Sequence, residues 1–435
     1  MVANRVGAVS SALLTDRYEL TMLRAALRDG TADRRCVFEV FARRLPEGRR
    51  FGVVGGLGRL LEAIEAYLPT EEEMAHLYDS GWIDSATGSW LKDYHFTGDI
   101  DGYAEGELYF PGSPILTVTG TFAEAVVLET LILSVLNFDS AVASAAARMV
   151  RAAGDRPLIE MGSRRTHEQA APAAARAAYL AGFAATSNLA AGFRYGVPTA
   201  GTSAHSFTLL HDTEADAFRA QIDALGLDTT LLVDTYDIAA GIRTAIEVAG
   251  PDLGAIRIDS GDLAVLAEQS REQLDSLGAT RTRIVLSGDL DEYALASLVA
   301  APVDAYGVGT SVVTGSGAPT AGYIYKLVEV DGRPVSKRSD NKMSPGGRKT
   351  AVRRHRSTGT ATEEVVCVGG APAQQAGDRH LQRPLMRAGA VVDDLPSLEQ
   401  SRAHLREVMK TVPWDGLKLS RGDPAIPTVH IGQQA

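Results

Sequence analysis

The chain has 435 residues, of which 45% are hydrophobic and 22% are charged, as in an ordinary soluble globular protein. This length is enough for one large α/β domain and a smaller second domain. The net charge of −11 makes the surface as a whole repel nucleic acid, so no nucleic-acid partner is expected. Any polyphosphate must then be held by locally clustered arginine and lysine side chains.

The cysteines and the start of the chain bear on the cellular compartment. The two cysteines, Cys36 and Cys367, have neither a metal-like nor a redox-like spacing, which indicates structural thiols in a reducing environment. The first 20 residues contain no apolar h-region and include Asp16 and Glu19, so no signal peptide is expected. We therefore predict a cytoplasmic protein.

The most apolar segment, residues 122–138, is not expected to cross a membrane. It is too short for a span, and Glu124 and Glu129 interrupt it. Because it is apolar on most of its faces, it is predicted to be a buried helix that begins at a capping box of Thr121 and Glu124. No membrane partner is expected.

Residues 1–115 differ from the middle of the chain in their sequence pattern and are predicted to contain both helices and strands. The glycine-rich run at residues 55–58 is followed by no Lys-Thr pair and no clear βαβ context, so helix capping and close packing are predicted there rather than phosphate binding. Helices are predicted at residues 20–27, from residue 58 to 67 and after the capping box of Thr70 and Glu73, and strands at residues 35–41 and 112–118.

In the middle of the chain, short apolar runs alternate with amphipathic helices at intervals of about 20 to 30 residues, which is typical of parallel βα units. Asp237 is placed to cap one of these helices and Gly250 to end it. Six or so units favour a barrel or partial barrel, with a doubly wound sheet as the alternative. The predicted strands are residues 231–234, 255–258, 283–286 and 303–308, preceded by segments near Leu158 and Ala200.

Polar groups follow these apolar runs repeatedly. In βα barrels the active site lies where the carboxyl ends of the strands meet the loops, so the groups are expected to share one rim. They are Arg164 and Arg165, His205, Asp234, Asp259 with Asp262, Ser287 with Asp289, and residues 307–311.

The cationic groups of this rim suit an anionic substrate. Guanidinium donors match phosphate and carboxylate oxygens, so Arg164, Arg165 and Arg257 could bind a pyrophosphate or a carboxylate. Structural salt bridges with Glu160 or Asp259 are the alternative. A histidine such as His205 can carry a proton or act as a nucleophile, whereas a bond to backbone would make it merely structural.

The remaining rim residues each allow a ligand role and a structural role. Asp259 and Asp262 would repel phosphate but could bind ribose hydroxyls or a Mg²⁺ carried by a pyrophosphate. Helix capping is the alternative, and it suits Asp262 better than Asp259. Glycines in residues 307–311 permit backbone N–H groups to approach a phosphate, or they simply form a tight turn.

Taken in order, these motifs resemble those of the nicotinate phosphoribosyltransferases, the type II phosphoribosyltransferases. That family has a TDxYxLTM opening, a double-arginine motif, an SN motif and a GTxAHS motif. The resemblance covers about residues 12–420, with Ser163 standing where relatives often carry threonine or a larger residue. The matching segments are Thr15–Met22, Gly162–Arg165, Thr186–Asn188, Gly201–Ser206, Asp259–Leu263, Ser287–Leu290 and Gly307–Ser311.

The resemblance implies a (partial) βα barrel with a second α+β domain that the N-terminal and C-terminal segments build together. The expected domains are residues 1–115, residues 116–350 with the barrel, and residues 351–435, which return to the N-terminal region. It also implies transfer of phosphoribosyl from phosphoribosyl pyrophosphate to nicotinate in NAD salvage, coupled to ATP hydrolysis through a phosphohistidine. ATP as co-substrate, Mg²⁺ with phosphoribosyl pyrophosphate, and a homodimer are expected.

Site roles follow from the same resemblance. His205 is the expected phosphohistidine and Asp259 a second catalytic residue. Tyr18 is expected against the nicotinate ring, across a dimer interface. Which arginine meets which anion stays open. The expected substrate-binding residues also include Arg164, Arg165, Ser206, Arg257, Ser287, Gly288, Gly309 and Thr310, of which the last four belong to loops expected to hold the 5-phosphate.

A basic cluster follows the barrel region. Lys326, Lys337, Arg338, Lys342 and residues 345–349 either form a solvated face or line the mouth of the site and steer anions. The family resemblance favours the second role.

Three other functions fit these motifs less well. Nicotinamide phosphoribosyltransferase shares the chemistry but has a different opening motif. Quinolinate phosphoribosyltransferase needs no ATP and is normally shorter. From another class, the chain could be a catalytically silent module that senses phosphorylated sugars, which the intact set of motifs disfavours.

Overall fold

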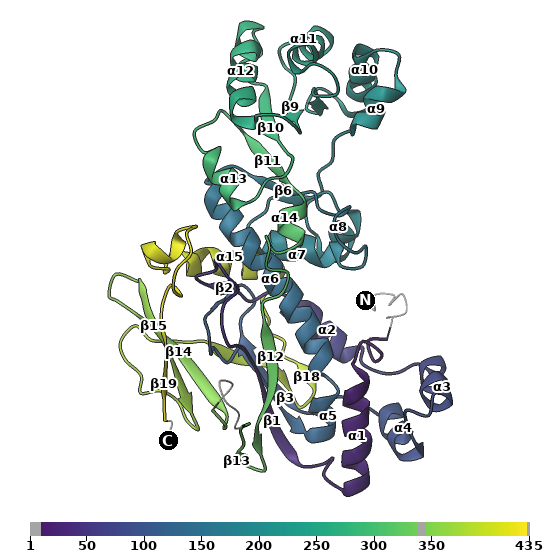
Figure 1. Ribbon diagram of the computed structural model, residues 1–435, viewed down its shortest axis with the longest axis vertical. Helices are drawn as coiled ribbons and strands as arrows, with labels where there is room; N and C mark the ends of the chain where they lie inside the picture. The colour runs from purple at the N-terminus through teal and green to yellow at the C-terminus, as the bar shows by residue number, and fades with distance from the viewer. Residues whose placement is uncertain (1–9, 338–344, 433–435) are drawn as a thin grey trace. The chain divides into compact units, whose positions relative to one another are not determined.

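The computed structural model describes residues 10–337 and 345–432 (Figure 1). The chain forms two compact units, residues 1–141 with 320–435 and residues 142–319. These bounds differ from the predicted domain bounds at 115 and 350. Residues 116–141 and 320–350 fall in the first unit because β5 (Leu116–Thr121) and β12 (Tyr323–Val330) both pair with β1 (Arg35–Ala42).

The first unit is built on a seven-stranded antiparallel sheet. Its strand order is β13-β12-β1-β5-β3-β17-β18. Because β17 (Gln382–Arg387) pairs with β3 (Asp99–Tyr103), the C-terminal segment completes a sheet begun by the N-terminal segment, as expected. The edge strands are β13 (Arg333–Pro334) and β18 (Ala390–Val391).

Two smaller sheets complete the strands of this unit. The two-stranded sheet pairs β2 (Gly52–Val53) with β4 (Leu108–Tyr109). The other has the order β16-β14-β15-β19 and consists of β16 (Arg379–His380), β14 (Lys349–His355), β15 (Ala361–Val368) and β19 (Thr428–Ile431).

A buried ion network joins distant segments of the first unit. Arg353 is 1% exposed, and its guanidinium donates to Glu107 at 2.5 Å and to Glu364 at 2.7 Å. Arg379 and His404 also contact the Glu107 carboxylate, at 2.6 and 2.9 Å. Burial alone would raise the pKa of Glu107, but Arg353 and its other partners hold that pKa well below the ordinary value.

Part of the basic cluster is structural. Lys349 is buried, and its Nζ lies 2.7 Å from Glu39 Oε2. Arg348 pairs with Asp101 at 2.7 Å. Lys349 is thus neither part of a solvated face nor available to an anion, and Arg348 already has a carboxylate partner. A steering role for the cluster stays a prediction. Arg338 and Lys342 lie outside the described residues.

Local sequence signals account for the helices of the first unit. Thr70 and Glu73 form the predicted capping box, and so do Thr121 and Glu124. Gly56 has φ +90°, and a Cβ there would lie 2.8 Å from Asp139, so close packing at the glycine-rich run is confirmed. The helices are α1 (Arg17–Asp29), α2 (Leu57–Glu65), α3 (Glu71–Asp79), α4 (Ser85–Lys92), α5 (Phe122–Val126), α15 (Leu398–Met409) and the 3₁₀ turn Trp414–Leu417.

The apolar helix is longer than predicted. After α5 the chain continues as α6 (Glu129–Ala153), because residues 139–153 are rich in alanine, the best helix former. Within the described residues, Phe122–Ala153 is the one segment long and apolar enough to cross a membrane by length and composition. In its most apolar window 67% of the residues are buried, as in the core helix of a globular protein.

The second unit is a curled sheet of six parallel strands, in the order β7-β6-β11-β10-β9-β8. Joining the two ends of this order would give the cyclic order of the strands in sequence, so the sheet is a βα barrel opened between β7 and β8. This confirms the predicted partial barrel. The strands are β6 (Leu158–Glu160), β7 (Ala185–Thr186), β8 (Thr230–Leu232), β9 (Ala255–Ile258), β10 (Arg283–Leu286) and β11 (Ala305–Val308).

One predicted strand is missing from the described sheet. The segment near Ala200 forms only an isolated bridge between Thr186 and Thr199. Pro198 has no N–H to donate to a neighbouring strand, so a longer ladder is disfavoured there.

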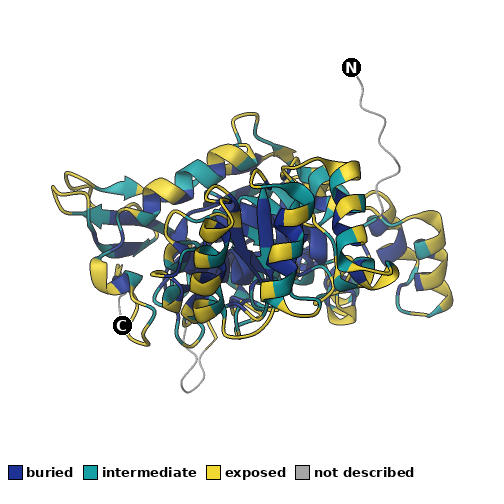
Figure 2. Cartoon of the chain, turned by 90° about the horizontal axis from the view of Figure 1, so that it is seen from above, coloured by how far each residue is buried: buried dark blue, intermediate teal, exposed yellow. Residues whose placement is uncertain are grey.

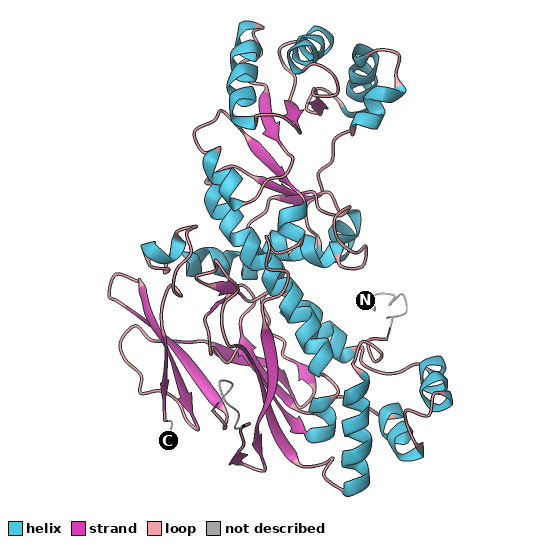
Figure 3. Ribbon diagram, in the orientation of Figure 1, coloured by secondary structure: helices cyan, strands magenta, loops and turns pink. Residues whose placement is uncertain are grey.

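Helices follow the strands of the second unit (Figure 3). Asp237 accepts a hydrogen bond at a helix start, so its predicted cap is confirmed, and Asp262 takes the capping role given as its alternative. Asp291 caps α13 in the same way. The strands are mainly buried, whereas helices and loops carry the exposed residues (Figure 2). The helices are α7 (Ala171–Ala181), α8 (Leu189–Tyr195), α9 (His205–Leu210), α10 (Glu214–Leu225), α11 (Ile238–Ala249), α12 (Leu263–Ser276), α13 (Glu292–Ser297) and α14 (Thr310–Val313).

Candidate active site

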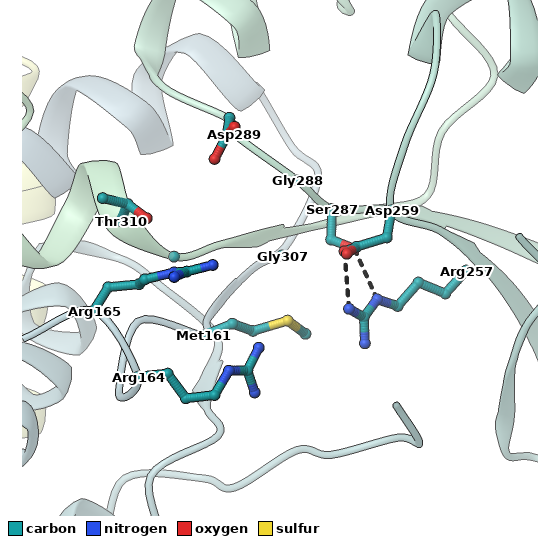
Figure 4. A pocket seen from close by; sticks show the side chains of 11 residues that line it. Met161, Arg164, Arg165, Arg257, Asp259, Ser287, Gly288, Asp289, Gly307 and Thr310 are labelled. Carbon is teal, nitrogen blue, oxygen red and sulfur yellow. Dashed lines mark hydrogen bonds and ion pairs between the residues drawn. The ribbon is translucent and has the colours of Figure 1, made fainter. Parts of the chain in front are cut away.

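A pocket of about 270 Å³ lies at the carboxyl ends of β6, β9, β10 and β11 (Figure 4). Its position is the one in which βα barrels place their active sites. The predicted catalytic and substrate-binding residues line it, except Tyr18, His205 and Ser206, and the predicted rim residues Asp234 and Asp262 also lie outside its lining. The lining residues are Met161, Arg164, Arg165, Arg257, Asp259, Ser287, Gly288, Asp289, Gly307, Gly309 and Thr310.

One wall of the pocket is a hydrogen-bonded cluster. Arg257 donates to Asp259 at 2.9 Å, to Ser287 at 2.7 Å and to Thr202 at 3.1 Å. The Ser287 hydroxyl in turn donates to Asp259. Burial alone would raise the pKa of Asp259, but Ser287 and Arg257 hold that pKa below the ordinary aspartate value. The carboxylate is therefore anionic at neutral pH and fixed in direction.

Gly288 allows this wall to form. Its φ is +127°, which side chains rarely adopt, and a Cβ there would lie 2.9 Å from the carbonyl oxygen of Asp259. The backbone after β10 can thus approach the backbone after β9 closely. A second pocket of about 530 Å³ shares Asp259, Gly288 and Asp289 with the first, so the two adjoin.

Positive charge is supplied to the pocket by the loop after β6. Arg164 and Arg165 are both exposed and reach into the pocket beside Met161 (Figure 4). Neither forms a salt bridge with any residue of the described ranges, so the structural salt bridge to Glu160 is absent there. Two guanidiniums without carboxylate partners are suited to bind an anionic ligand.

His205 begins α9 and lies outside the pocket lining, but it is linked to it. Its Nε2 is 3.1 Å from Asp234 Oδ1. Asp234 Oδ2 accepts the backbone N–H of Asp259 at 2.9 Å and the Ser260 hydroxyl at 2.9 Å. Asp234 thus joins the histidine to the carboxylate wall. Ser206, the next residue along α9, is exposed.

Tyr18 belongs to the first unit, and its place beside a substrate ring stays a prediction. It lies on α1 and is 45% exposed. Burial of part of the ring and the nearby carboxylate of Glu129 raise the pKa of the Tyr18 hydroxyl, so the phenol is neutral at physiological pH.

Comparison with known proteins assigns the family. The family model described as the nicotinate phosphoribosyltransferase (NAPRTase) N-terminal domain matches residues 13–137. A nicotinate phosphoribosyltransferase of Mycobacterium tuberculosis is 63% identical over 428 residues, which cover 96% of this chain and 95% of that protein. The chain belongs to the nicotinate phosphoribosyltransferase family.

Other nicotinate phosphoribosyltransferases agree. The Bacillus subtilis protein is 38% identical over 359 residues, covering 79% of this chain and 73% of that protein. The crystal structure of human nicotinic acid phosphoribosyltransferase matches with a TM-score of 0.83 at 26% identity, over 96% of this chain and 97% of that one. As a nicotinate phosphoribosyltransferase, the chain is an enzyme, which argues against the silent sensing module.

Sequence reasoning left several pocket residues out of the substrate-binding set. Asp289 follows a predicted strand and carried a usable signal, whereas Gly307 was assigned to a glycine turn. Asp234, which ends another predicted strand, does not line the pocket but bonds to the backbone of Asp259 in its wall. Nothing in the sequence marked Met161 as a pocket residue, because an apolar residue after a strand normally belongs to the core. Its side chain fills the pocket because Gly307 leaves room for it: a Cβ at Gly307 would lie 2.6 Å from the Met161 sulfur.

Proposed function

We propose that the enzyme transfers the phosphoribosyl group of phosphoribosyl pyrophosphate to nicotinate, giving nicotinate mononucleotide and pyrophosphate in NAD salvage. The observation that carries this proposal is the convergence of two unpaired arginines, a fixed carboxylate and glycine-rich loops in one pocket. Formation of nicotinate mononucleotide by the purified protein, with nicotinamide and quinolinate as competing acceptors, tests it. Preferential use of either competitor would overturn the acceptor assignment.

The chemistry requires both charges of the pocket. The ring nitrogen of nicotinate attacks the anomeric carbon while the bond to pyrophosphate breaks, so the ribose gains oxocarbenium character. Asp259 is anionic and fixed by Arg257 and Ser287, which suits it to bind ribose hydroxyls and oppose this positive charge. Arg164 and Arg165 supply donors for the leaving pyrophosphate or for the nicotinate carboxylate.

Magnesium is proposed to enter with the pyrophosphate. The described residues contain no group of three or more His, Cys, Asp or Glu side chains placed to hold a metal, so no all-protein cage is present among them. A Mg²⁺ bound through one carboxylate and substrate oxygens fits, because Mg²⁺ is usually held that way. Asp289 lines the pocket and has no salt bridge within the described ranges, so it would hold the ion, which neutralises phosphate charge.

We also propose that His205 couples the reaction to ATP hydrolysis. The imidazole presents Nε2 to Asp234, which leaves Nδ1 as the nitrogen to attack the γ-phosphorus while ADP departs. A phosphoryl group there adds negative charge two hydrogen bonds away from Asp259. That charge would change the affinity of the neighbouring loops for anionic substrates.

His205→Asn is expected to abolish labelling by γ-labelled ATP. The wild-type protein should acquire acid-labile, base-stable label, because a phosphohistidine has that stability. The matched control is His211→Asn, since His211 ends the same helix and contacts only the Phe207 carbonyl and ring among its described partners. Acid-labile label that persists in His205→Asn but disappears in His211→Asn would show that His211, and not His205, is the phosphorylated residue.

Two substitutions distinguish the contribution of the Tyr18 ring from that of its hydroxyl. If the ring stacks on nicotinate, Tyr18→Ala should raise KM for nicotinate by roughly tenfold, the worth of one aromatic contact. Tyr18→Phe retains the ring and should stay close to wild type. Unchanged KM in both variants would remove Tyr18 from the site.

A homodimer is proposed because the family resemblance puts Tyr18 across a subunit interface. Co-expression of Tyr18→Ala with Asp259→Asn, on differently tagged chains, gives a mixed dimer with one intact site. With nicotinate well below the wild-type KM, it should recover about half of the wild-type activity per dimer if the two residues act across the interface. Activity no higher than that of either single variant would indicate that both residues act within one subunit.

A further inference from the structure

We propose that Glu160 is a positioning residue, whose buried carboxylate holds two loops together and so directs Arg164 and Arg165 into the pocket. The inference rests on the proposed function, in which these arginines bind an anionic substrate. Glu160 itself does not line the pocket. Its effect is transmitted through hydrogen bonds of the loop after β6 and the loop after β7.

Glu160 is the last residue of β6 and is only 1% exposed. One carboxylate oxygen accepts the backbone N–H of Gly162, and the other accepts the Thr186 hydroxyl at 2.5 Å. Within the described residues it has no cationic partner. Burial raises the pKa of this carboxyl group. A buried carboxyl without a cation contributes little to folding stability, so stability alone does not explain it.

The first bond fixes the arginine loop. Gly162 is packed so closely that a Cβ there would lie 2.3 Å from Val313 and 2.9 Å from the carbonyl oxygen of Gly309. The carbonyl oxygen of Gly162 accepts the N–H of Arg165 at 2.8 Å. Anchoring Gly162 therefore sets the turn that carries both guanidiniums, directly beside the glycine loop of the pocket.

The second bond ties this turn to the SN loop. Thr186 Oγ1 also accepts the N–H of Asn188 at 2.9 Å, and Asn188 Nδ2 donates to Ser163 Oγ at 3.0 Å. The N–H of Ser187 donates to the carbonyl oxygen of Glu160 at 2.8 Å. These bonds close a ring from Glu160 through the SN loop to the residue that precedes Arg164. This ring of hydrogen bonds fixes the loop after β6 relative to the loop after β7.

Only a carboxylate accepts both bonds. A glutamine has the same shape but one acceptor and one donor, so it keeps the bond to Gly162 only by pointing its amide at Thr186 Oγ1. That oxygen already accepts from Asn188, and with a second donor pointed at it the Thr186 O–H would lose the carboxylate acceptor that Glu160 provides. Glu160→Gln is therefore expected to loosen the ring without leaving a cavity or a buried charge.

The test compares Glu160→Gln and Thr186→Val with Glu168→Gln, whose side chain is exposed on the same segment. The first two variants should each lower kcat/KM for phosphoribosyl pyrophosphate by roughly tenfold or more, the scale of a misplaced binding group. Glu160→Gln should leave Tm unchanged within about 3 °C. Combining the two variants should add nothing, because they share one bond. Glu168→Gln should match wild type. Equal activity of Glu160→Gln and wild type would overturn the proposal.

A second comparison separates positioning from general damage. In an Arg164→Ala/Arg165→Ala background, Glu160→Gln should have no further effect on inorganic pyrophosphate binding, measured by calorimetry, or on kcat/KM. A loss of the same factor in that background would show that Glu160 acts by another route. If the double arginine variant itself retains full activity, the proposed function of the pocket fails instead, and the two failures are distinguishable.

Discussion

Asp259→Asn is expected to lower kcat/KM by roughly 100-fold or more, with kcat carrying most of the loss. The carboxylate opposes charge that develops at the ribose, and loss of one such electrostatic contact typically costs about 10²–10³ in rate. Asparagine keeps the shape of Asp259 and can still accept from Arg257 at 2.9 Å, so the wall should persist without its charge. Steady-state kinetics with phosphoribosyl pyrophosphate varied at saturating nicotinate measures the effect.

The matched control is Asp262→Asn, three residues along the same loop. Asp262 caps α12 and lines only the second pocket, and asparagine caps a helix almost as well. A loss in Asp262→Asn as large as that in Asp259→Asn would contradict the assignment. Ser287 and Arg257 depress the pKa of Asp259. In a plot of kcat/KM against pH, protonation of Asp259 should therefore lower the rate only below the ordinary aspartate pKa of about 4. A decrease of kcat/KM near neutral pH must come from another group.

Arg353→Ala is expected to lower the free energy of unfolding by about 3–5 kcal/mol, the scale for breaking a buried ion pair. The variant leaves Glu107 and Glu364 buried with fewer donors, in the network that joins β14 and β15 to the segment before β4. Because Glu107 holds its charge through Arg353, the loss should be larger at neutral pH than at a pH low enough to protonate Glu107. Denaturant unfolding followed by tryptophan fluorescence measures it.

The control for this variant is Arg356→Ala, at the residue that directly follows β14. Arg356 is exposed, and its removal should change the free energy of unfolding by less than about 0.5 kcal/mol. If Arg353→Ala unfolds at the same denaturant concentration as Arg356→Ala, the network does not hold the C-terminal strands in place.

Local patterns in the sequence predicted the local structure well. Helix caps depend on residues within one turn, so residues close together in the sequence specify them. Examples are the capping box of Thr121 with Glu124 and the aspartate cap at Asp262. The run of βα units fixed the partial barrel, and with it the rim where Arg165 and Thr310 meet. Right-handed, repeated connections leave few other arrangements.

Features that depend on distant partners escaped prediction. Lys349 looked like a free surface cation because its partner, Glu39, lies 310 positions away in the sequence. Asp234 reads as a rim residue, but its bonds to His205 and Asp259 appear only when three loops meet. The ring around Glu160 is of the same kind, since its side chain bonds to Thr186, 26 positions away in the sequence. Periodicity in a sequence carries no information on such pairings.

Pyrophosphate release by the purified protein, measured in phosphoribosyl pyrophosphate and Mg²⁺ with and without nicotinate and ATP, is the most direct test of the pocket's function. Release should require nicotinate, should match nicotinate mononucleotide one for one, and should increase with ATP in the wild type but not in His205→Asn. Release that proceeds equally without nicotinate, or a wild-type enzyme no faster than Asp259→Asn, would contradict the account.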